Sequence, residues 1–209
     1  MNYHDVEQYS DEWWELRAGR FTASLASKII TPTGKPSAQY QKEIGRLIAE
    51  AKGWQEPADF VETEWMARGT ELEDQARTWF CLERDIDVMN GGIITDGYFA
   101  ASCDALTGYM PNPIPCEFKV PKPSTHIAWL IKGGLPDEHR AQVHFQMVVA
   151  EAPHAWFMSY HPEMEPLLVK VVADDYTENL RSYMEKAALE LSKAYKKITG
   201  EEYETLLQV

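Results

Sequence analysis

Cysteine is scarce in this 209-residue chain, and long apolar runs are absent. The three cysteines, Cys81, Cys103 and Cys116, are an odd number without Cys-x-x-Cys spacing. This argues against a disulfide framework and against a cysteine-bound zinc or iron–sulfur site. No run approaches the roughly 18–20 apolar residues of a membrane span. The polar, acidic first residues lack the basic start and apolar core of a signal peptide. We therefore expect a cytoplasmic protein that does not associate with membranes.

Positive charge is also limited. The chain has 20 Lys and Arg against 33 Asp and Glu, a formal net charge of −13. Broad, non-specific affinity for nucleic acid depends on basic surface, so this balance argues against it. A local basic groove remains compatible with the composition, as does a nucleic-acid enzyme whose acidic site is neutralised by divalent cations.

The residues that are abundant indicate a globular domain. Hydrophobic residues make up 44% of the chain, and seven Trp, ten Tyr and seven Phe supply large side chains for a core. No internal repeat or long Gly/Ser/Pro linker divides the sequence. We therefore expect one domain over residues 1–209.

Apolar periodicity and turn residues predict an α/β fold with a mixed central β-sheet flanked by helices. Strands are expected at Ile93–Thr95, Tyr98–Ser102, Ile114–Val120, His154–His161 and Leu167–Val172. Helices are expected at Ser24–Ile30, from a cap at Ser37 to Gly53, at Thr63–Arg84, from Asp137 to about Ala152, and from Asp174 or Asp175 onward.

The strongest local signal is Glu117-Phe118-Lys119, with Asp104 thirteen positions before Glu117. Residues i and i+2 of a strand share a face, so Glu117 and Lys119 should point together while Phe118 faces the opposite side. Asp104 is expected to end the preceding strand and to lie beside Glu117 across a hairpin closed by residues 108–113. Two carboxylates can hold Mg²⁺, and a nearby lysine can position water or stabilise charge on a phosphate. The alternative is an ordinary Glu–Lys pair on an exposed sheet.

Further polar residues accompany this pair. Asp96 lies eight residues before Asp104, and Glu73 belongs to an acidic helical segment. Gln142 and Gln146 follow His139 at helical spacing. Taken alone, any acid of the Glu73 segment is compatible with a solvated acidic face, and His139 and Gln142 are better explained as ordinary helix surface.

Five motifs together resemble the lambda-exonuclease family, the viral-type alkaline exonucleases of the Asp…Glu-x-Lys nuclease superfamily. The motifs are Trp14-Glu15-Leu16-Arg17-Ala18-Gly19-Arg20-Phe21-Thr22-Ala23-Ser24, Gly69-x-x-x-Glu73-x-x-Ala76-Arg77, Ser102-Cys103-Asp104-Ala105-Leu106, Glu117-Phe118-Lys119-Val120-Pro121, and Gln142-x-x-x-Gln146-Met147. The resemblance spans about Trp14 to Tyr160. The family often has Ser-Pro-Asp-Gly where this chain has Ser102-Cys103-Asp104-Ala105, and often a tyrosine where this chain has His139.

The resemblance implies a restriction-endonuclease-like nuclease core that acts as a 5′→3′ exonuclease on double-stranded DNA. Such enzymes release mononucleotides and leave a 3′ single strand for recombination by annealing. It also implies a homotrimer, DNA with 5′-phosphate ends, a single-strand annealing protein as partner, and a phage or prophage in a bacterial host cell. The implied cofactor is Mg²⁺, with two ions in the site and Mn²⁺ as the alternative metal.

Residue roles carry over from the matching positions. The resemblance implies metal ligation by Asp104, Glu117 and the Val120 carbonyl, and catalytic roles for Lys119, Glu73 and Gln142. Arg17, Ser24 and Ser102 match residues that hold the 5′-phosphate. Trp65 and Met66 lie near the position of a family residue that separates the two DNA strands. Asp96 is the least well matched acidic residue.

Two alternatives remain at this stage. One is another nuclease of the superfamily, such as an endonuclease. The other is a catalytically inactive member that binds DNA ends or a partner. The acidic charge is reconciled with DNA binding if a few cations line the DNA path, namely Arg17, Arg20, Lys28, Lys35, Arg68 and Lys119.

Overall fold

The computed structural model describes the backbone of residues 1–54 and 64–203, and the side chains of these residues apart from 64–71. Its elements, in chain order, are β1 (Asn2–His4), α1 (Asp11–Arg17), β2 (Phe21–Thr22), the 3₁₀ helix η1 (Ala23–Lys28), α2 (Tyr40–Ala51), α3 (Glu64–Arg84), β3 (Met89–Asn90), β4 (Ile93–Asp96), β5 (Phe99–Ser102), β6 (Ala105–Tyr109), β7 (Asn112–Lys119), α4 (Pro123–Lys132), α5 (Asp137–Val149), β8 (His154–Ser159), β9 (Leu167–Val172) and α6 (Asp175–Thr199).

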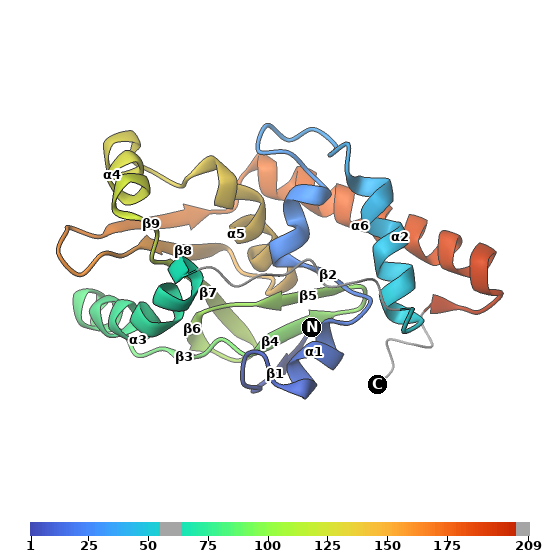
Figure 1. Cartoon of the computed structure of the whole chain (residues 1–209), viewed down its shortest axis with the longest axis horizontal. Coiled ribbons are helices and arrows are strands. Elements are labelled where there is room, and N and C mark those ends of the chain that lie inside the picture. The colour runs from blue at the N-terminus through green and yellow to red at the C-terminus, as the bar shows by residue number, and fades with distance from the viewer. Residues whose placement is uncertain (55–63, 204–209) are drawn as a thin grey trace.

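The described strands form two mixed sheets rather than the single central sheet expected from the sequence. One has the order β1-β4-β5-β2, with only the β2–β5 pair parallel. The other has the order β3-β6-β7-β8-β9, with only the β7–β8 pair parallel. Helices lie around both sheets (Figure 1). The predicted α/β class with flanking helices is therefore confirmed.

The chain passes between the sheets at two adjacent points. Gly91 and Gly92 connect β3 to β4, and Cys103 and Asp104 connect β5 to β6. A Cβ atom on Gly91 would lie 1.6 Å from the carbonyl oxygen of Cys103, so no larger residue fits between the crossing segments. This close approach places Asp104 at the junction of the two sheets.

Helix α5 is buried between the sheets and the other helices. Phe145 and Val149 pack in the same core as Leu180 and Leu191 of α6. On another side of α5, Val143 packs against Phe157 of β8. Because α5 is covered on several sides, its polar residues need partners inside the protein.

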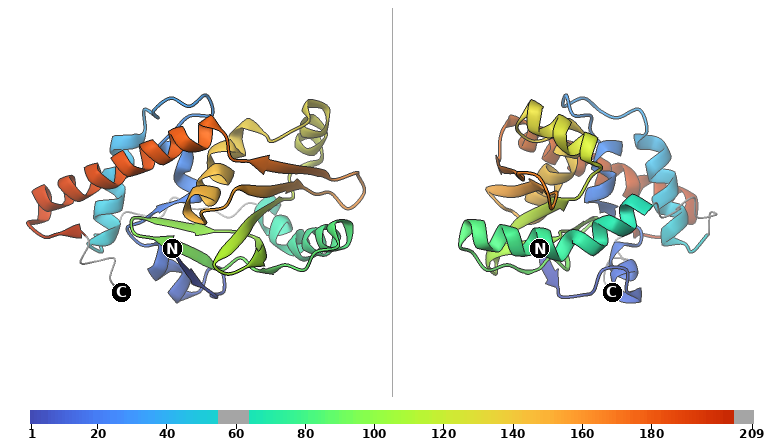
Figure 2. Two further views of the ribbon diagram at one scale, coloured as in Figure 1. Left: turned by 180° about the vertical axis from the view of Figure 1, so that it is seen from behind. Right: turned by 60° about the vertical axis from the view of Figure 1, so that its left-hand side comes forward.

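Helix α3 covers the opposite face of β7. Ala76 and Phe80 of α3 pack with Cys116 and Phe118 of β7 and with Trp156 of β8. Figure 1 shows α3 at one end of the molecule, beside the five-stranded sheet. At the other end α6 extends beyond the sheets and packs against α2, as Figure 2 also shows from behind. Within the described residues, no helix is both long and apolar enough to cross a membrane.

Several local predictions need correction. Residues 105–109, which were not predicted as a strand, form β6, and the hairpin closes at Met110 and Pro111, within the predicted range 108–113. Helix α4 was not predicted at all, because its apolar residues form one run, 127–131, rather than a stripe at helical spacing. Helix α2 begins at Tyr40 with Gln39 as its cap, because Ser37 is used in a preceding turn. By contrast, Asp174 caps α6 as predicted and accepts a hydrogen bond from the Thr177 amide.

Replacing Gly91 with alanine should destabilise the protein by about 3 kcal/mol, because the added methyl group collides with backbone that cannot move aside. The free energy of unfolding from urea titration measures this effect. Gly45→Ala is the matched control, since Gly45 lies within α2 with no atom within 4 Å of the added Cβ. That variant should gain about 0.5–1 kcal/mol from helix propensity. Equal stability of the two variants would contradict the close packing at the crossing.

Candidate nuclease site

Glu117 is the centre of the candidate site. It lies on β7 with 1% of its surface exposed, and it points away from the core that Phe118 occupies. Gln142 Nε2 donates to Glu117 Oε1 and Gln146 Nε2 donates to Glu117 Oε2, each at 2.5 Å. The two glutamines lie one turn apart on α5. Both carboxylate oxygens are therefore held by side chains of one helix.

Asp104 lies beside Glu117, as predicted, but it follows β5 rather than ending it. Its Oδ2 atom accepts a hydrogen bond of 2.6 Å from the Phe118 amide. Burial raises the pKa of Asp104 well above its usual range, and the negative charge of Glu117 raises it further. Both effects disfavour the charged form of Asp104.

Lys119 places a positive charge beside the two carboxylates. Its ammonium group forms an ion pair with Glu117 and lies 4.0 Å from Asp104 Oδ2. Burial alone would lower the pKa of Lys119, but the two carboxylates outweigh burial and raise it. Lys119 therefore stays protonated at neutral pH and can act as a cation, not as a base.

Glu73 lies at the edge of this group. Its side chain is ion-paired with Arg77 at 3.3 Å, and Arg77 also donates to the Asp104 carbonyl at 2.7 Å. Burial raises the pKa of Glu73, with opposing effects from Arg77 and Lys119 and a further increase from Glu117. The structure thus brings Glu73 into electrostatic contact with the site, as predicted, and assigns Arg77 to connect α3 with Asp104.

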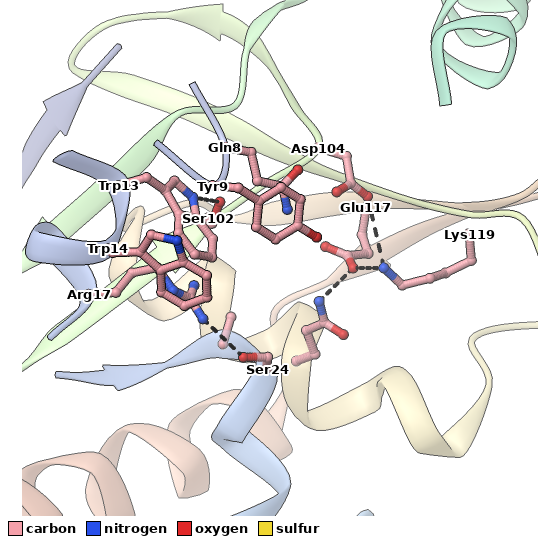
Figure 3. A pocket seen from close by; sticks show the side chains of 12 residues that line it. Gln8, Tyr9, Trp13, Trp14, Arg17, Ser24, Ser102, Asp104, Glu117 and Lys119 are labelled. Atoms are coloured by element: carbon pink, nitrogen blue, oxygen red, sulfur yellow. Dashed lines mark hydrogen bonds and ion pairs between the residues drawn. The ribbon is translucent and has the colours of Figure 1, made fainter. Parts of the chain in front are cut away.

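A cavity of about 390 Å³ joins the carboxylates to the predicted phosphate-binding residues. Figure 3 shows Asp104, Glu117 and Lys119 on one side and the α1 side chains Trp13, Trp14 and Arg17 on the other. The complete lining is Gln8, Tyr9, Trp13, Trp14, Arg17, Ala23, Ser24, Ser102, Asp104, Glu117, Lys119 and Gln142.

Arg17, Ser24 and Ser102 come together in this cavity, although Ser102 is far from the other two in sequence. Arg17 donates to Ser24 Oγ at 3.4 Å, and its guanidinium lies 4.1 Å from the centre of the Trp13 ring. Trp13 in turn donates to Ser102 Oγ at 3.0 Å. Burial lowers the pKa of Arg17 to about 10, so the side chain remains charged at neutral pH. A charged guanidinium beside two hydroxyl groups can bind a phosphate.

The structure does not bring every predicted residue to the site. Asp96 lies at the far end of β4, half exposed, with its carboxylate 3.3 Å from the N-terminal amine. Arg20 is buried and donates to the carbonyls of Leu16 and Gly97, so it does not line a DNA path. The side chains of Trp65, Met66 and Arg68 lie outside the described residues.

The predicted backbone ligand, Val120, lies one residue past the end of β7. Along a strand, the N–H and C=O groups of one residue point to the same side. The Phe118 amide donates to Asp104, whereas the Lys119 carbonyl accepts from the amide of Tyr160, the residue that follows β8. The alternation therefore directs the Phe118 carbonyl to the same side as Asp104, which makes it a second candidate backbone ligand besides the Val120 carbonyl.

Gln146 is the site residue whose role sequence reasoning missed. It is fully buried and donates to both Glu117 and the Ser102 carbonyl. The available signal was its position one turn after Gln142, which places both amides on one face of α5.

The donor set fits a hard divalent cation. Two carboxylates and a backbone carbonyl offer only oxygen atoms, which Mg²⁺ prefers. Burial and the neighbouring charge of Glu117 raise the pKa of Asp104, and a bound cation would oppose both effects. Among residues 1–54 and 72–203, no three His, Cys, Asp or Glu side chains cluster as a ligand group.

A family model described as a YqaJ-like viral recombinase domain matches residues 12–153. No match was found among curated protein sequences.

Solved structures also resemble the chain. LHK-Exo in complex with dAMP shares 25% sequence identity, with a TM-score of 0.76 over 91% of this chain and 97% of that one. The alkaline exonuclease LHK-Exo from Laribacter hongkongensis, at 24% identity, has a TM-score of 0.71 over 91% of this chain and 99% of that one. A phage-related exonuclease from Haemophilus somnus 129PT, at 13% identity, has the same fold, with a TM-score of 0.62 over 87% of this chain and 95% of that one.

These matches support an exonuclease role and DNA as the partner. They also agree with the family resemblance that the five sequence motifs indicate. The chain belongs to the YqaJ-like viral recombinase domain family, which is lambda-exonuclease-like.

Proposed function

We propose that the protein is a Mg²⁺-dependent exonuclease that digests one strand of linear duplex DNA from its 5′ end. It would release mononucleotides and leave a 3′ single strand for recombination by annealing. One observation carries the proposal: the phosphate-binding group of Arg17, Ser24 and Ser102 and the acidic group of Asp104, Glu117 and Lys119 line the same cavity. A strand end held by the first group presents its phosphodiester to the second.

Asp104, Glu117 and the Phe118 carbonyl would hold Mg²⁺, with Glu73 at the edge of the site. Bound there, the metal supplies positive charge that stabilises the phosphate and favours deprotonation of water. Gln142 and Gln146 keep the Glu117 carboxylate in one orientation through hydrogen bonds to its two oxygens. Lys119 holds a protonated amine beside both carboxylates, where it can orient water or stabilise developing negative charge.

The phosphate-binding group accounts for the direction of digestion. Arg17 offers two parallel N–H groups to a terminal phosphate, and Ser24 adds a hydroxyl donor. The Ser102 hydroxyl donates to the Gly92 carbonyl and accepts from Trp13, so it would have to turn away from Gly92 to donate to a phosphate. A terminal phosphate held by Arg17, in the same cavity as the acidic group, would fix the position of the strand relative to that group. Each cleavage would then release one nucleotide. The expectation of an annealing protein as partner rests on the family resemblance alone.

Asp104→Asn and Lys119→Ala should each reduce Mg²⁺-dependent cleavage of linear duplex DNA by a hundredfold or more, on the order seen when a group that stabilises transition-state charge is removed. Asparagine keeps an oxygen that can accept from the Phe118 amide, which favours retention of the fold. Lys193→Ala, an exposed lysine on α6, is the control and should cleave normally.

Thermal unfolding with and without Mg²⁺ separates the two roles. Mg²⁺ should raise the Tm of the wild-type protein and of Lys119→Ala, and raise it less for Asp104→Asn, because binding to the folded state stabilises it. Near-normal turnover by either folded variant would refute the assignment.

Arg17→Ala should slow digestion of 5′-phosphorylated ends by roughly tenfold to a hundredfold, the effect of losing hydrogen bonds to a charged group. Digestion of 5′-hydroxyl ends should change much less. The assay is release of end label from duplexes that differ only at the 5′ end. Arg84→Ala is a matched control, since Arg84 also stacks on a tryptophan, 4.5 Å from the Trp156 ring, but outside the cavity. Equal slowing on both substrates, or digestion from the 3′ end, would rule out the phosphate pocket.

A homotrimer is proposed on the family resemblance and on size, because a single small domain cannot encircle a duplex whereas a closed ring can. Light scattering should give three times the 23.9 kDa mass of one chain. A monomeric mass at assay concentration would exclude the ring.

A further inference from the structure

Three aromatic rings form one wall of the cavity, beside the phosphate-binding group. Tyr9 and Trp13 have ring centres 5.3 Å apart, Trp13 and Trp14 have theirs 4.6 Å apart in an edge-to-face arrangement, and Tyr9 and Trp14 have theirs 6.3 Å apart. Trp13 is buried and bonded to Ser102, but Tyr9 and Trp14 are 56% and 53% exposed. The exposed rings face a cavity whose other lining residues are mostly polar, with charged, hydroxyl and amide side chains (Figure 3).

Tyr9 also has an unusual backbone conformation, with φ at +68°. Large residues seldom adopt positive φ, and the other described non-glycine residues that do so, Asp85 and Glu151, lie just after helices, where this conformation is common. Tyr9 instead precedes a helix. Its neighbour Ser10 is held by bonds from its N–H and hydroxyl groups to the Glu7 carbonyl. The turn thus keeps Tyr9 at the cavity despite an unfavourable backbone angle, which indicates a role for its side chain.

The position of these rings relative to Arg17 indicates what they bind. Arg17 stacks on Trp13, so the guanidinium and the aromatic cluster form one continuous surface. In a nucleotide a single sugar separates the 5′-phosphate from the base. A phosphate at Arg17 therefore leaves its base within reach of the same wall. The cavity volume of about 390 Å³ lies in the range of small-molecule sites.

We propose that the exposed rings of Tyr9 and Trp14 form a stacking surface for the base of the 5′-terminal nucleotide. This inference rests on the proposed exonuclease function and adds a nucleobase subsite to it. Stacking on an aromatic ring tolerates every base, because each base has a π face. It also suits a chain with a net charge of −13, which has few cations to contact phosphates. Tyr9 and Trp14 are positioning residues for the strand end, while Trp13 supports Arg17 and Ser102.

The test compares duplexes with a 5′-phosphorylated terminal nucleotide that either carries its base or is abasic. The wild-type protein should digest the abasic end with kcat/KM lower on the order of tenfold, as expected for loss of one stacked base. Tyr9→Ala and Trp14→Ala should slow the normal end and leave the abasic end nearly unchanged. Trp14→Phe should retain most of the preference for a base. Trp54→Ala, which removes an equally exposed tryptophan outside the cavity, should behave as wild type.

Binding of dAMP and of 2-deoxyribose 5-phosphate, measured by calorimetry in the presence of chelator, gives a readout independent of cleavage. Trp14→Ala should weaken dAMP binding roughly tenfold and leave the sugar phosphate unaffected. Equal digestion of normal and abasic ends by the wild-type protein would overturn the stacking surface. So would equal slowing of both ends by the Tyr9 and Trp14 variants, which would indicate contact with another partner.

Failure of the stacking surface can be distinguished from failure of the exonuclease assignment. If the exonuclease assignment holds and only the stacking surface is wrong, wild-type digestion still depends on Mg²⁺ and on the 5′-phosphate. If the assignment itself is wrong, that dependence is absent whatever the terminal base.

Discussion

The buried negative charge of Glu117 is the constraint around which this structure is arranged. A carboxylate with 1% exposure must find hydrogen-bond donors inside the protein, because water cannot reach it to solvate the charge. Two donors are the amides of Gln142 and Gln146, and the third is the ammonium of Lys119. These contacts require α5 to lie directly against one face of β7. The same contacts leave Glu117 fixed in orientation before any ligand arrives, so little reorganisation is needed when the site is used.

Strand alternation separates this chemistry from the core. Glu117 and Lys119 face α5 and the cavity, while Cys116 and Phe118 face α3 and pack with Phe80. One short strand therefore belongs to an apolar cluster and to a charged site at once. Asp104 joins Glu117 at the crossing between the sheets. It follows β5 at the point where Gly91 allows the β3–β4 and β5–β6 connections to lie in close contact. The Ser102 side chain lies two residues away and connects the crossing to Trp13 and hence to Arg17.

The sequence by itself determined the class of fold and the identity of the main acidic group. Glu117, Lys119 and Phe118 could be assigned to opposite faces because the period of a strand is two. Helices α3 and α5 were also predicted to within a few residues, and the start of α6 was predicted at Asp174 or Asp175, because helix periodicity and start signals are local. Family motifs then brought Arg17, Ser24, Ser102, Glu73 and Gln142 into one hypothesis, and the structure places these residues around one cavity or at its edge.

Only the tertiary structure decided the division into two sheets, the burial of α5 and the place of Asp96. Strand pairing depends on contacts between distant segments, so β6 was not predicted as a strand and its pairing with β7 identifies it. Asp96 and Asp104 are equally acidic in the sequence, but one points to the N-terminal amine and the other to the Phe118 amide. Arg20 and Arg17 lie three residues apart, yet one donates to carbonyls in the interior and the other faces the cavity. Residue types in the sequence identify candidate site residues, but the path of the backbone between the sheets determines which of them lie together. The reason is that the site depends on distances between segments, which no local sequence pattern specifies.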